Sequence, residues 1–299
     1  MITWIGTGHA GVLCDEVDAR IPASDGGYTQ GLGVFETMRV ESDRAFLLPW
    51  HLERMRRGAA RIGIDLPGDD ALRDIVAAVI AANPLPPQPI GSRSPSPQRE
   101  GQANEPASTQ VRRLRLTASA GAHGPTLVCT LAPLDVVPST ARLATSPWRR
   151  NERSALVGVK STSYAELALA QRSAVASGAT DALLLNTVGE LAECATANLF
   201  VLSAGALRTP PESAGILPGI GRRFVLTIAR SLSEAIGEVR EETLARDDLA
   251  AADGAFCVSA LRGIRPVTTV DARAIPCGAA IDALAAAYVH EAAAEWCWT

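Results

Sequence analysis

A proline-rich segment between Asn83 and Gln110 sets the strongest limit on how this chain can fold. The segment holds seven of the nineteen prolines and few large apolar side chains. Proline cannot continue a helix or donate to a sheet ladder, and so few apolar side chains cannot offset the entropy lost on ordering. We therefore interpret residues 84–110 as a loop or disordered insertion, and the core has to be built from the residues on either side of it.

Length and composition indicate a globular protein of one large or two medium domains. The chain has 299 residues, of which 47% are hydrophobic, which is enough to bury a sizeable core. The net charge is −4 and the arginines are scattered, so nothing resembles the basic stripe of a nucleic-acid-binding protein. We expect a small-molecule partner and no nucleic acid.

The sequence carries no feature that directs it to a membrane or to an oxidising compartment. The first residues, MITWIGTGHAG, lack a basic region followed by an apolar one, and no apolar run approaches the roughly 20 residues that span a bilayer. The six cysteines show no C-x-x-C pair and no histidine at zinc spacing. We expect a cytoplasmic protein with buried, reduced thiols and no metal site.

The hydrophobic pattern predicts a mixed α/β or α+β fold. Helical spacing covers residues 47–64 and 70–82, the second with Asp69 or Asp70 as N-cap, and returns at 164–177, 221–236 and 279–296. Short β-rich runs cover residues 111–120, 126–134, 182–186, 197–203 and 255–259. The C-terminal half is therefore richer in sheet, and we expect two domains that meet between Ala120 and Val137.

Lys160 is the only lysine of the chain, since the other twenty-seven cationic side chains are all arginine. Arginine supplies charge and hydrogen bonds as well as lysine does, but its guanidinium stays protonated and cannot form an imine. A lysine that arginine has not replaced therefore indicates a Schiff base, either to a carbonyl substrate or to pyridoxal phosphate. A single surface lysine left by an arginine-rich composition is the alternative.

A run of thirty residues from Glu193 resembles the class IV pyridoxal-phosphate enzymes, the fold-type IV family of branched-chain and D-amino-acid aminotransferases and 4-amino-4-deoxychorismate lyase. The run contains ECATANLF, then LRTP, then GILPGIGRR. The N-terminal half agrees, since QGLGVFETMRV and FLLPWHLERM look like the family's glycine-rich strand and its His-x-x-Arg helix. The resemblance implies a smaller N-terminal α/β domain (1–125), a linker (126–136) and a larger cofactor-binding domain (137–299).

The resemblance assigns pyridoxal 5'-phosphate as the cofactor and gives individual residues a role. Lys160 lies at the position of the Schiff-base lysine, and Tyr164, one turn later if a helix has begun, would contact the cofactor's phenolic oxygen. Glu193, five residues before Asn198, would pair with the ring nitrogen, because an electron-sink pyridine has to be held protonated. Glu190 would point to the opposite face and remain solvated.

The phosphate of the cofactor requires N–H donors and a cation. The glycine-bracketed turn before the helix at 221 offers the amides of Ile220 and Gly221 at a helix N-terminus, where anions bind. Arg54 resembles the family's phosphate-binding arginine, and Ser259 with Ala260 resembles a second contact through a hydroxyl and an amide. Many relatives have threonine where Gly221 stands, so here only the amide remains.

The resemblance leaves the reaction open between two chemistries. RLRLTASAG and SALRGIRPV look like segments of bacterial aminodeoxychorismate lyases, which favours conversion of 4-amino-4-deoxychorismate to 4-aminobenzoate and pyruvate for folate biosynthesis. Arg262 and Arg39 are candidate contacts for the substrate carboxylates. The alternative is an aminotransferase of the branched-chain or D-amino-acid type, and a non-catalytic relative is a third hypothesis. Family members are homodimers, so a homodimer is implied.

Overall fold

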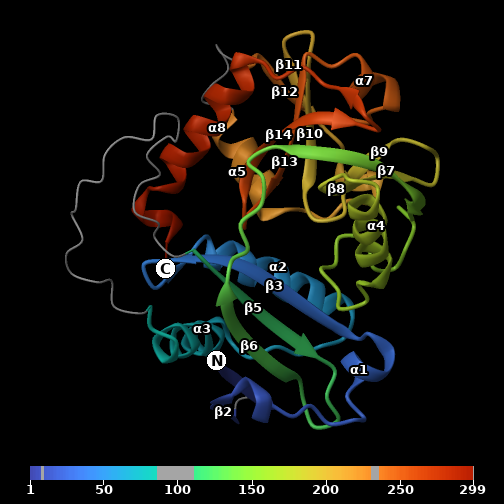
Figure 1. Cartoon of the computed structure of the whole chain (residues 1–299). Helices are drawn as coiled ribbons and strands as arrows, with labels where there is room; N and C mark the ends of the chain where they lie inside the picture. The colour runs from blue at the N-terminus through green and yellow to red at the C-terminus, as the bar shows by residue number, and fades with distance from the viewer. Residues whose placement is uncertain (8–9, 86–110, 230–235, 299) are drawn as a thin grey trace, which may run out of the picture.

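The structure, a computed structural model, describes residues 1–7, 10–85, 111–229 and 236–298, which form two β-sheets with helices against them (Figure 1). Nearly all of the insertion predicted at 84–110 lies outside these residues. Within the described part, no helix combines the length and the apolar character that crossing a membrane requires. The predicted mixture of helices and strands is confirmed.

The N-terminal half forms an antiparallel sheet with two helices against it. In the described residues its strands follow the order β2-β1-β6-β5-β3-β4. Helix α2 packs against β3, and α3 packs against β1 and β6. The bounds are β1 (Ile2–Thr7), β2 (Ala10–Asp15), α1 (Gly26–Gln30), β3 (Gly33–Glu41), β4 (Arg44–Ala45), α2 (Leu48–Arg61), α3 (Asp69–Ala82), β5 (Arg112–Ser119) and β6 (Thr126–Pro133).

Both N-terminal helices follow their predicted pattern, with one correction at a helix end. Helix α2 carries proline in its first turn, where the missing N–H costs nothing, and its buried face includes His51 and Arg54, one turn apart. Helix α3 begins after Gly68, so the prediction that Asp69 or Asp70 is the N-cap was wrong. Both aspartates lie inside the first turn, where their charge still favours the helix dipole.

The C-terminal half forms a larger mixed sheet. The order of its described strands is β12-β11-β10-β13-β14-β7-β8-β9, with β15 paired to β14. Strands β7 and β8 are parallel, and helix α4 packs against both. The bounds are β7 (Ala141–Arg150), α4 (Ala165–Ala176), β8 (Asp181–Asn186), β9 (Leu191–Cys194), β10 (Asn198–Ser203), β11 (Ala206–Thr209), α5 (Ile220–Ala229), β12 (Glu238–Glu241), α7 (Arg246–Ala250), β13 (Gly254–Ser259), β14 (Gly263–Val270), β15 (Arg273–Ala274) and α8 (Ala279–Ala292).

The segment expected to link two domains, 126–136, is not a linker over most of its length. Residues Thr126–Pro133 form β6, which pairs with β5 and β1 inside the first sheet. Alternate residues such as Leu127 and Cys129 are fully buried, and this burial holds the segment in the sheet. The chain therefore passes from one sheet to the other through residues 134–140, before β7 begins.

Residues near the C-terminus contact the segment after β4 and so connect the two sheets. Phe46 and Leu47, which follow β4, belong to the apolar cluster around α5 and α8 and not to the core of their own sheet. The Leu47 amide donates to the Cys297 carbonyl (2.6 Å), and Phe46 packs on Trp298 with ring centroids 5.2 Å apart. These contacts fix the start of α2, and with it His51 and Arg54, relative to the second sheet.

Four of the six cysteines are buried, as predicted. They are Cys129, Cys194, Cys257 and Cys297. Cys277 is exposed and Cys14 is half-buried, so the prediction of buried thiols was wrong for these two. Cys14 lies on β2, the edge strand of the first sheet, and Cys277 lies in the segment between β15 and α8.

Candidate functional site

A cavity of about 650 Å³ is lined by residues of both sheets and collects nine of the ten predicted site residues. Those on its wall are Arg54, Lys160, Tyr164, Glu193, Ile220, Gly221, Ser259, Ala260 and Arg262. Segments far apart in the sequence supply them: helix α2, the loop before α4, strand β9, the start of α5 and the end of β13. Arg39 is absent from the cavity wall and forms an ion pair with Glu41.

Lys160 is held between the sheets by its own backbone. Its carbonyl accepts a hydrogen bond from the Phe35 amide (2.9 Å), and the Thr162 amide donates to the Gly33 carbonyl (2.9 Å), so this loop pairs with the start of β3. The Nζ atom lies 4.5 Å from the centroid of the Phe35 ring. Burial and the charge of Arg54 lower the pKa of Lys160 to about 8. A neutral amine is therefore accessible near neutral pH.

The two carboxylate oxygens of Glu193 differ in their hydrogen bonding to the described residues. Oε2 accepts hydrogen bonds from the Leu217 amide (2.9 Å) and from Asn198 Nδ2 (3.3 Å). Oε1 is buried and has no hydrogen-bond partner in the described part of the chain, although Arg150 Nε lies 3.4 Å away as an ion pair. Burial raises the pKa of Glu193 to about 7, against the opposing charges of Arg150, Lys160 and Arg54.

Arg54 belongs to a buried cluster of three charged or titratable side chains. Its guanidinium donates from Nε (2.8 Å) and Nη2 (2.6 Å) to the two oxygens of Glu36, and from Nη1 to the Pro218 carbonyl (3.1 Å). His51 Nδ1 lies 2.6 Å from Glu36 Oε2. Despite burial, the charges of Arg54 and His51 lower the pKa of Glu36 to about 2. The bond to Pro218 connects α2 directly to the glycine turn before α5.

The glycine turn brings three backbone segments into contact. A Cβ atom on Gly219 would lie 1.8 Å from Asn198 Oδ1, and one on Gly221 would lie 2.7 Å from the carbonyl carbon of Ser259. Only glycine allows these approaches without displacement. The start of α5 consequently lies against Ser259 and Ala260 on the cavity wall. The first N–H groups of a helix have no partner inside the helix, so those of Ile220 and Gly221 are available to an anion.

We expect Gly219→Ala to damage both stability and cofactor binding. The new methyl group would collide with Asn198, which is buried and bonded to Leu217 and Glu193, so the turn has to move. Overpacking of this kind typically costs about 1–3 kcal/mol. Urea unfolding and cofactor titration of the apoenzyme measure the two effects. Gly68→Ala is the control, since a Cβ there meets nothing within 4 Å and the variant loses only the preference of the α3 N-cap for glycine over alanine. Cofactor binding weakened equally in both variants would refute the prediction.

Tyr164 reaches the cavity as the residue that precedes a helix. Helix α4 begins at Ala165, so Lys160 and Tyr164 are not joined by a helical turn as the spacing suggested. The Tyr164 hydroxyl donates to the Ala195 carbonyl (3.0 Å), and its ring packs edge-on against Phe35. Burial and the nearby carboxylates of Asp181 and Glu193 raise the pKa of Tyr164 to about 12. Glu190 is half-buried and accepts from Asn186 Nδ2 (2.7 Å), so it is not the solvated residue expected.

The wall carries arginines besides Arg54, and of these only Arg262 was predicted as a site residue. Arg262 Nη1 is buried without a hydrogen-bond partner among the described residues, and Arg113 and Arg115 line the same cavity. The alternation of arginine with apolar residues in β5 could have placed Arg113 and Arg115 on one face. Arg150, at the end of β7, also lines the cavity, and no local pattern in the sequence indicates it.

The geometry defines a class of site: an amine with a lowered pKa, a buried carboxylate oxygen without a hydrogen-bond partner among the described residues, and a helix N-terminus with an arginine that can bind an anion. Comparison with known proteins agrees. The family model for amino-transferase class IV matches residues 33–270, and the chain belongs to this family. This membership confirms the predicted family and the prediction that the protein is an enzyme. It also confirms the predicted cofactor, pyridoxal 5'-phosphate.

Three individual proteins illustrate the range of the similarity. A putative branched-chain-amino-acid aminotransferase of Methanocaldococcus jannaschii is 31% identical over 277 residues, 89% of this chain and 88% of that protein. Aminodeoxychorismate lyase of Bacillus subtilis is 26% identical over 274 residues, covering 87% and 85%. The crystal structure of the branched-chain aminotransferase of Thermoproteus uzoniensis with norvaline superposes with a TM-score of 0.82 at 27% identity, covering 98% and 94%.

Proposed function

We propose that the protein is a pyridoxal-phosphate-dependent lyase that converts 4-amino-4-deoxychorismate to 4-aminobenzoate and pyruvate. The observation that carries the proposal is the arginine on the cavity wall: Arg262 presents a buried Nη1 with no hydrogen-bond partner in the described part of the chain. Arg113 and Arg115 line the same space. A substrate with two carboxylates can pair with more than one guanidinium group, whereas a branched-chain amino acid presents one carboxylate and an aliphatic side chain.

The residues of the cavity fit the cofactor. Lys160 supplies the amine for the Schiff base, and Glu193 Oε1, buried and without a hydrogen-bond partner among the described residues, is an acceptor for the ring N–H. The amides of Ile220 and Gly221, the Ser259 hydroxyl, the Ala260 amide and the Arg54 guanidinium would hold the phosphate. Tyr164 would lie beside the phenolic oxygen. Bound there, the cofactor supplies an electron sink for the carbon next to the substrate nitrogen.

Lys160 is the group that moves protons in this proposal. With a pKa of about 8, a useful fraction of its amine is neutral near pH 7, and it can remove the proton from the ring carbon that bears the substrate nitrogen. The bond from the ring to the enolpyruvyl oxygen then breaks and the ring becomes aromatic. The protonated Lys160 can return its proton to the departing group, which leaves as pyruvate.

We expect Arg262→Leu to weaken the binding of a dianionic substrate. Hydrogen bonds to charged groups contribute about 1.5–3 kcal/mol, which corresponds to a rise in KM of about 10- to 100-fold with a smaller change in kcat. Steady-state kinetics on purified holoenzyme measures both constants. Arg39→Leu is the control, because Arg39 is absent from the cavity wall and should leave KM unchanged. An unchanged KM in Arg262→Leu would contradict the proposed contact.

Transamination is the second candidate, and the relatives favour it. The chain shares more identity with the branched-chain aminotransferase of Methanocaldococcus jannaschii than with the lyase of Bacillus subtilis. In that reaction the same Lys160 amine would pass the proton to the cofactor, and a keto acid would accept the amine. The cofactor contacts are common to both reactions, so an assay with the substrates of each reaction is needed to distinguish them.

Release of pyruvate in the absence of a keto acid tests the proposal directly. Cofactor-loaded protein is given aminodeoxychorismate alone, and pyruvate is followed with a coupled dehydrogenase, with Lys160→Ala as the blank. Release that depends on Lys160 supports the lyase. No release from protein that retains its visible cofactor band would refute the lyase and favour transamination, which is then assayed with amino donors and 2-oxoglutarate.

A homodimer is proposed as well, on the strength of the family resemblance. Thr37, Arg113 and Thr117 point to the same face of the first sheet, and their side chains are only partly buried or exposed. A second copy would find a polar surface there next to the cavity. Light scattering coupled to size-exclusion chromatography gives the mass, and a monomer at micromolar concentration would exclude a stable dimer.

A further inference from the structure

Arg150 is the cavity-lining cation closest to Glu193, the carboxylate proposed to accept a hydrogen bond from the ring nitrogen of the cofactor. Its Nε lies 3.4 Å from Glu193 Oε1 and donates a hydrogen bond to the Gly215 carbonyl (2.9 Å). Its side chain is 16% exposed and that of Glu193 is 5% exposed, so water screens the pair only weakly. The other charged or donor groups that face Glu193 are Lys160, Arg54, the Leu217 amide and Asn198 Nδ2.

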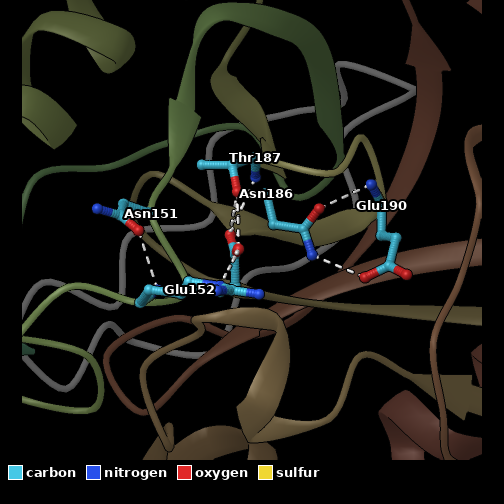
Figure 2. A network of polar contacts seen from close by, with 6 residues as sticks. Asn151, Glu152, Asn186, Thr187 and Glu190 are labelled. Atoms are coloured by element: carbon cyan, nitrogen blue, oxygen red, sulfur yellow. Dashed lines mark hydrogen bonds and ion pairs between the residues drawn. The ribbon is translucent and has the colours of Figure 1, made fainter.

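A network of polar contacts holds the segment of Arg150 against the hairpin that leads to Glu193 (Figure 2). Glu152 accepts from the Thr187 amide (3.0 Å) and from its hydroxyl (2.7 Å). Asn186 and Glu190 exchange two further bonds across the same hairpin, 2.7 and 2.8 Å long. Arg150 also pairs with Asn186 in the parallel ladder of β7 and β8. The position of Arg150 relative to Glu193 is therefore fixed from two sides.

The loop that supplies the Leu217 amide is fixed by the same segment. Gly215 has a positive φ of 88°, and a Cβ atom on it would lie 2.8 Å from Glu152 Cα. Gly215 can therefore approach Glu152 closely while its carbonyl receives the bond from Arg150. The segment from Arg150 to Glu152 therefore contacts two elements that position Glu193. These are the hairpin that precedes Glu193 and the loop whose Leu217 amide bonds Glu193 Oε2.

We propose that Arg150 is the positioning residue that favours the ionised form of Glu193, so that the proton shared with the cofactor lies on the ring nitrogen and not on the carboxyl group. Buried next to a pyridine nitrogen, a carboxylate can take the proton and form a neutral pair, in which the ring no longer withdraws electrons. A guanidinium 3.4 Å from the Glu193 carboxylate stabilises its negative charge, which favours the shared proton on the ring nitrogen. The inference rests on the proposed role of Glu193 and holds for lyase and aminotransferase alike.

Arg150→Met is the test, with Arg150→Lys and Arg149→Met beside it. Opposite charges at this range shift a carboxyl pKa by about 1–3 units, so we expect Arg150→Met holoenzyme at neutral pH to show the infrared C=O band of a protonated carboxyl group. The ¹⁵N shift of labelled cofactor should move towards that of neutral pyridine, and kcat should fall about 10- to 100-fold. The band is assigned to Glu193 by its absence in the double variant with Glu193→Gln.

The two companion variants separate charge from structure. Lysine keeps the charge but loses the Nε–H group that bonds the Gly215 carbonyl, so Arg150→Lys should recover the wild-type ¹⁵N shift and most of kcat. Arg149 is exposed on the neighbouring position of β7, so Arg149→Met should match wild type in every measurement. A wild-type ¹⁵N shift and no C=O band in folded Arg150→Met would overturn the inference, as would failure of Arg150→Lys to recover the shift. A wild-type protein that takes up no cofactor would instead refute the proposed function.

Discussion

Lys160→Ala will remove turnover and the visible absorption band of the bound cofactor together. A general base alone contributes about 10²–10⁴-fold to a rate, and the variant also loses the group that binds the cofactor covalently, so we expect kcat to fall by at least about 10³-fold. The side chain opens into the cavity and is half-buried, so its removal should leave the fold intact. Absorption spectra, turnover and circular dichroism measure these three properties.

The composition of the chain provides an unusually clean control. Because Lys160 is the only lysine, borohydride reduction of the holoenzyme can leave a stable cofactor label on one side chain only, apart from the N-terminal amine. Peptide mass spectrometry should find the label on the peptide that contains Lys160. Lys160→Arg keeps the charge without the imine chemistry and should be as inactive as Lys160→Ala. A labelled and active Lys160→Arg protein would contradict the assignment.

The sequence predicted those parts of the site that local pattern determines. Lys160 was found by its composition, and the glycine turn before α5 was found because its spacing matches that of a family. Arg54 was singled out because the segment with His51 and Arg54 resembles the family's His-x-x-Arg helix. In each case the feature lies within a few residues of the chain, so that no knowledge of the tertiary fold was needed.

The parts that the sequence did not predict depend on contacts between distant segments. Arg150 is 43 positions from Glu193 and meets it because β7 lies next to β8, which in turn pairs with β9, the strand of Glu193. Glu36 pairs with Arg54 across 18 positions, although an acidic residue in the apolar run GLGVFETM is itself unusual. The hydrophobic pattern predicted a β-rich run over residues 126–134, but the domain bounds treated 126–136 as a linker. A domain boundary has no local pattern, and the place of β6 in the first sheet depends on its neighbours β1 and β5.

Glu36 is where we expect the largest effect on stability. It is fully buried and bonded to Arg54 and His51, so Glu36→Gln leaves a buried guanidinium without a compensating charge. Removing one partner of a buried ion pair typically costs about 3–5 kcal/mol. Urea unfolding of the apoenzyme measures the loss. Glu53→Gln is the control, since the pair of Glu53 with Arg223 is exposed and such pairs contribute about 0–1 kcal/mol.

The same pair predicts how stability depends on pH. The pKa of Glu36 is lowered from 4.5 to about 2, so the folded state binds fewer protons than the unfolded state between these values. The stabilisation, about 3 kcal/mol, is complete above pH 4.5 and is lost as the pH falls towards 2. Burial also lowers the pKa of His51 below 6.5, which destabilises the fold in the same direction as the pH falls.

A comparison of wild type with Glu36→Gln isolates this contribution from that of Glu193. The raised pKa of Glu193, about 7, acts in the opposite direction, but its effect changes between pH 4.5 and 7 and is common to both proteins. The difference in unfolding free energy between them should therefore be largest above pH 4.5 and shrink steadily between pH 4.5 and 2. A difference that stays constant over this range would show that Glu36 acts through packing and not through its charge.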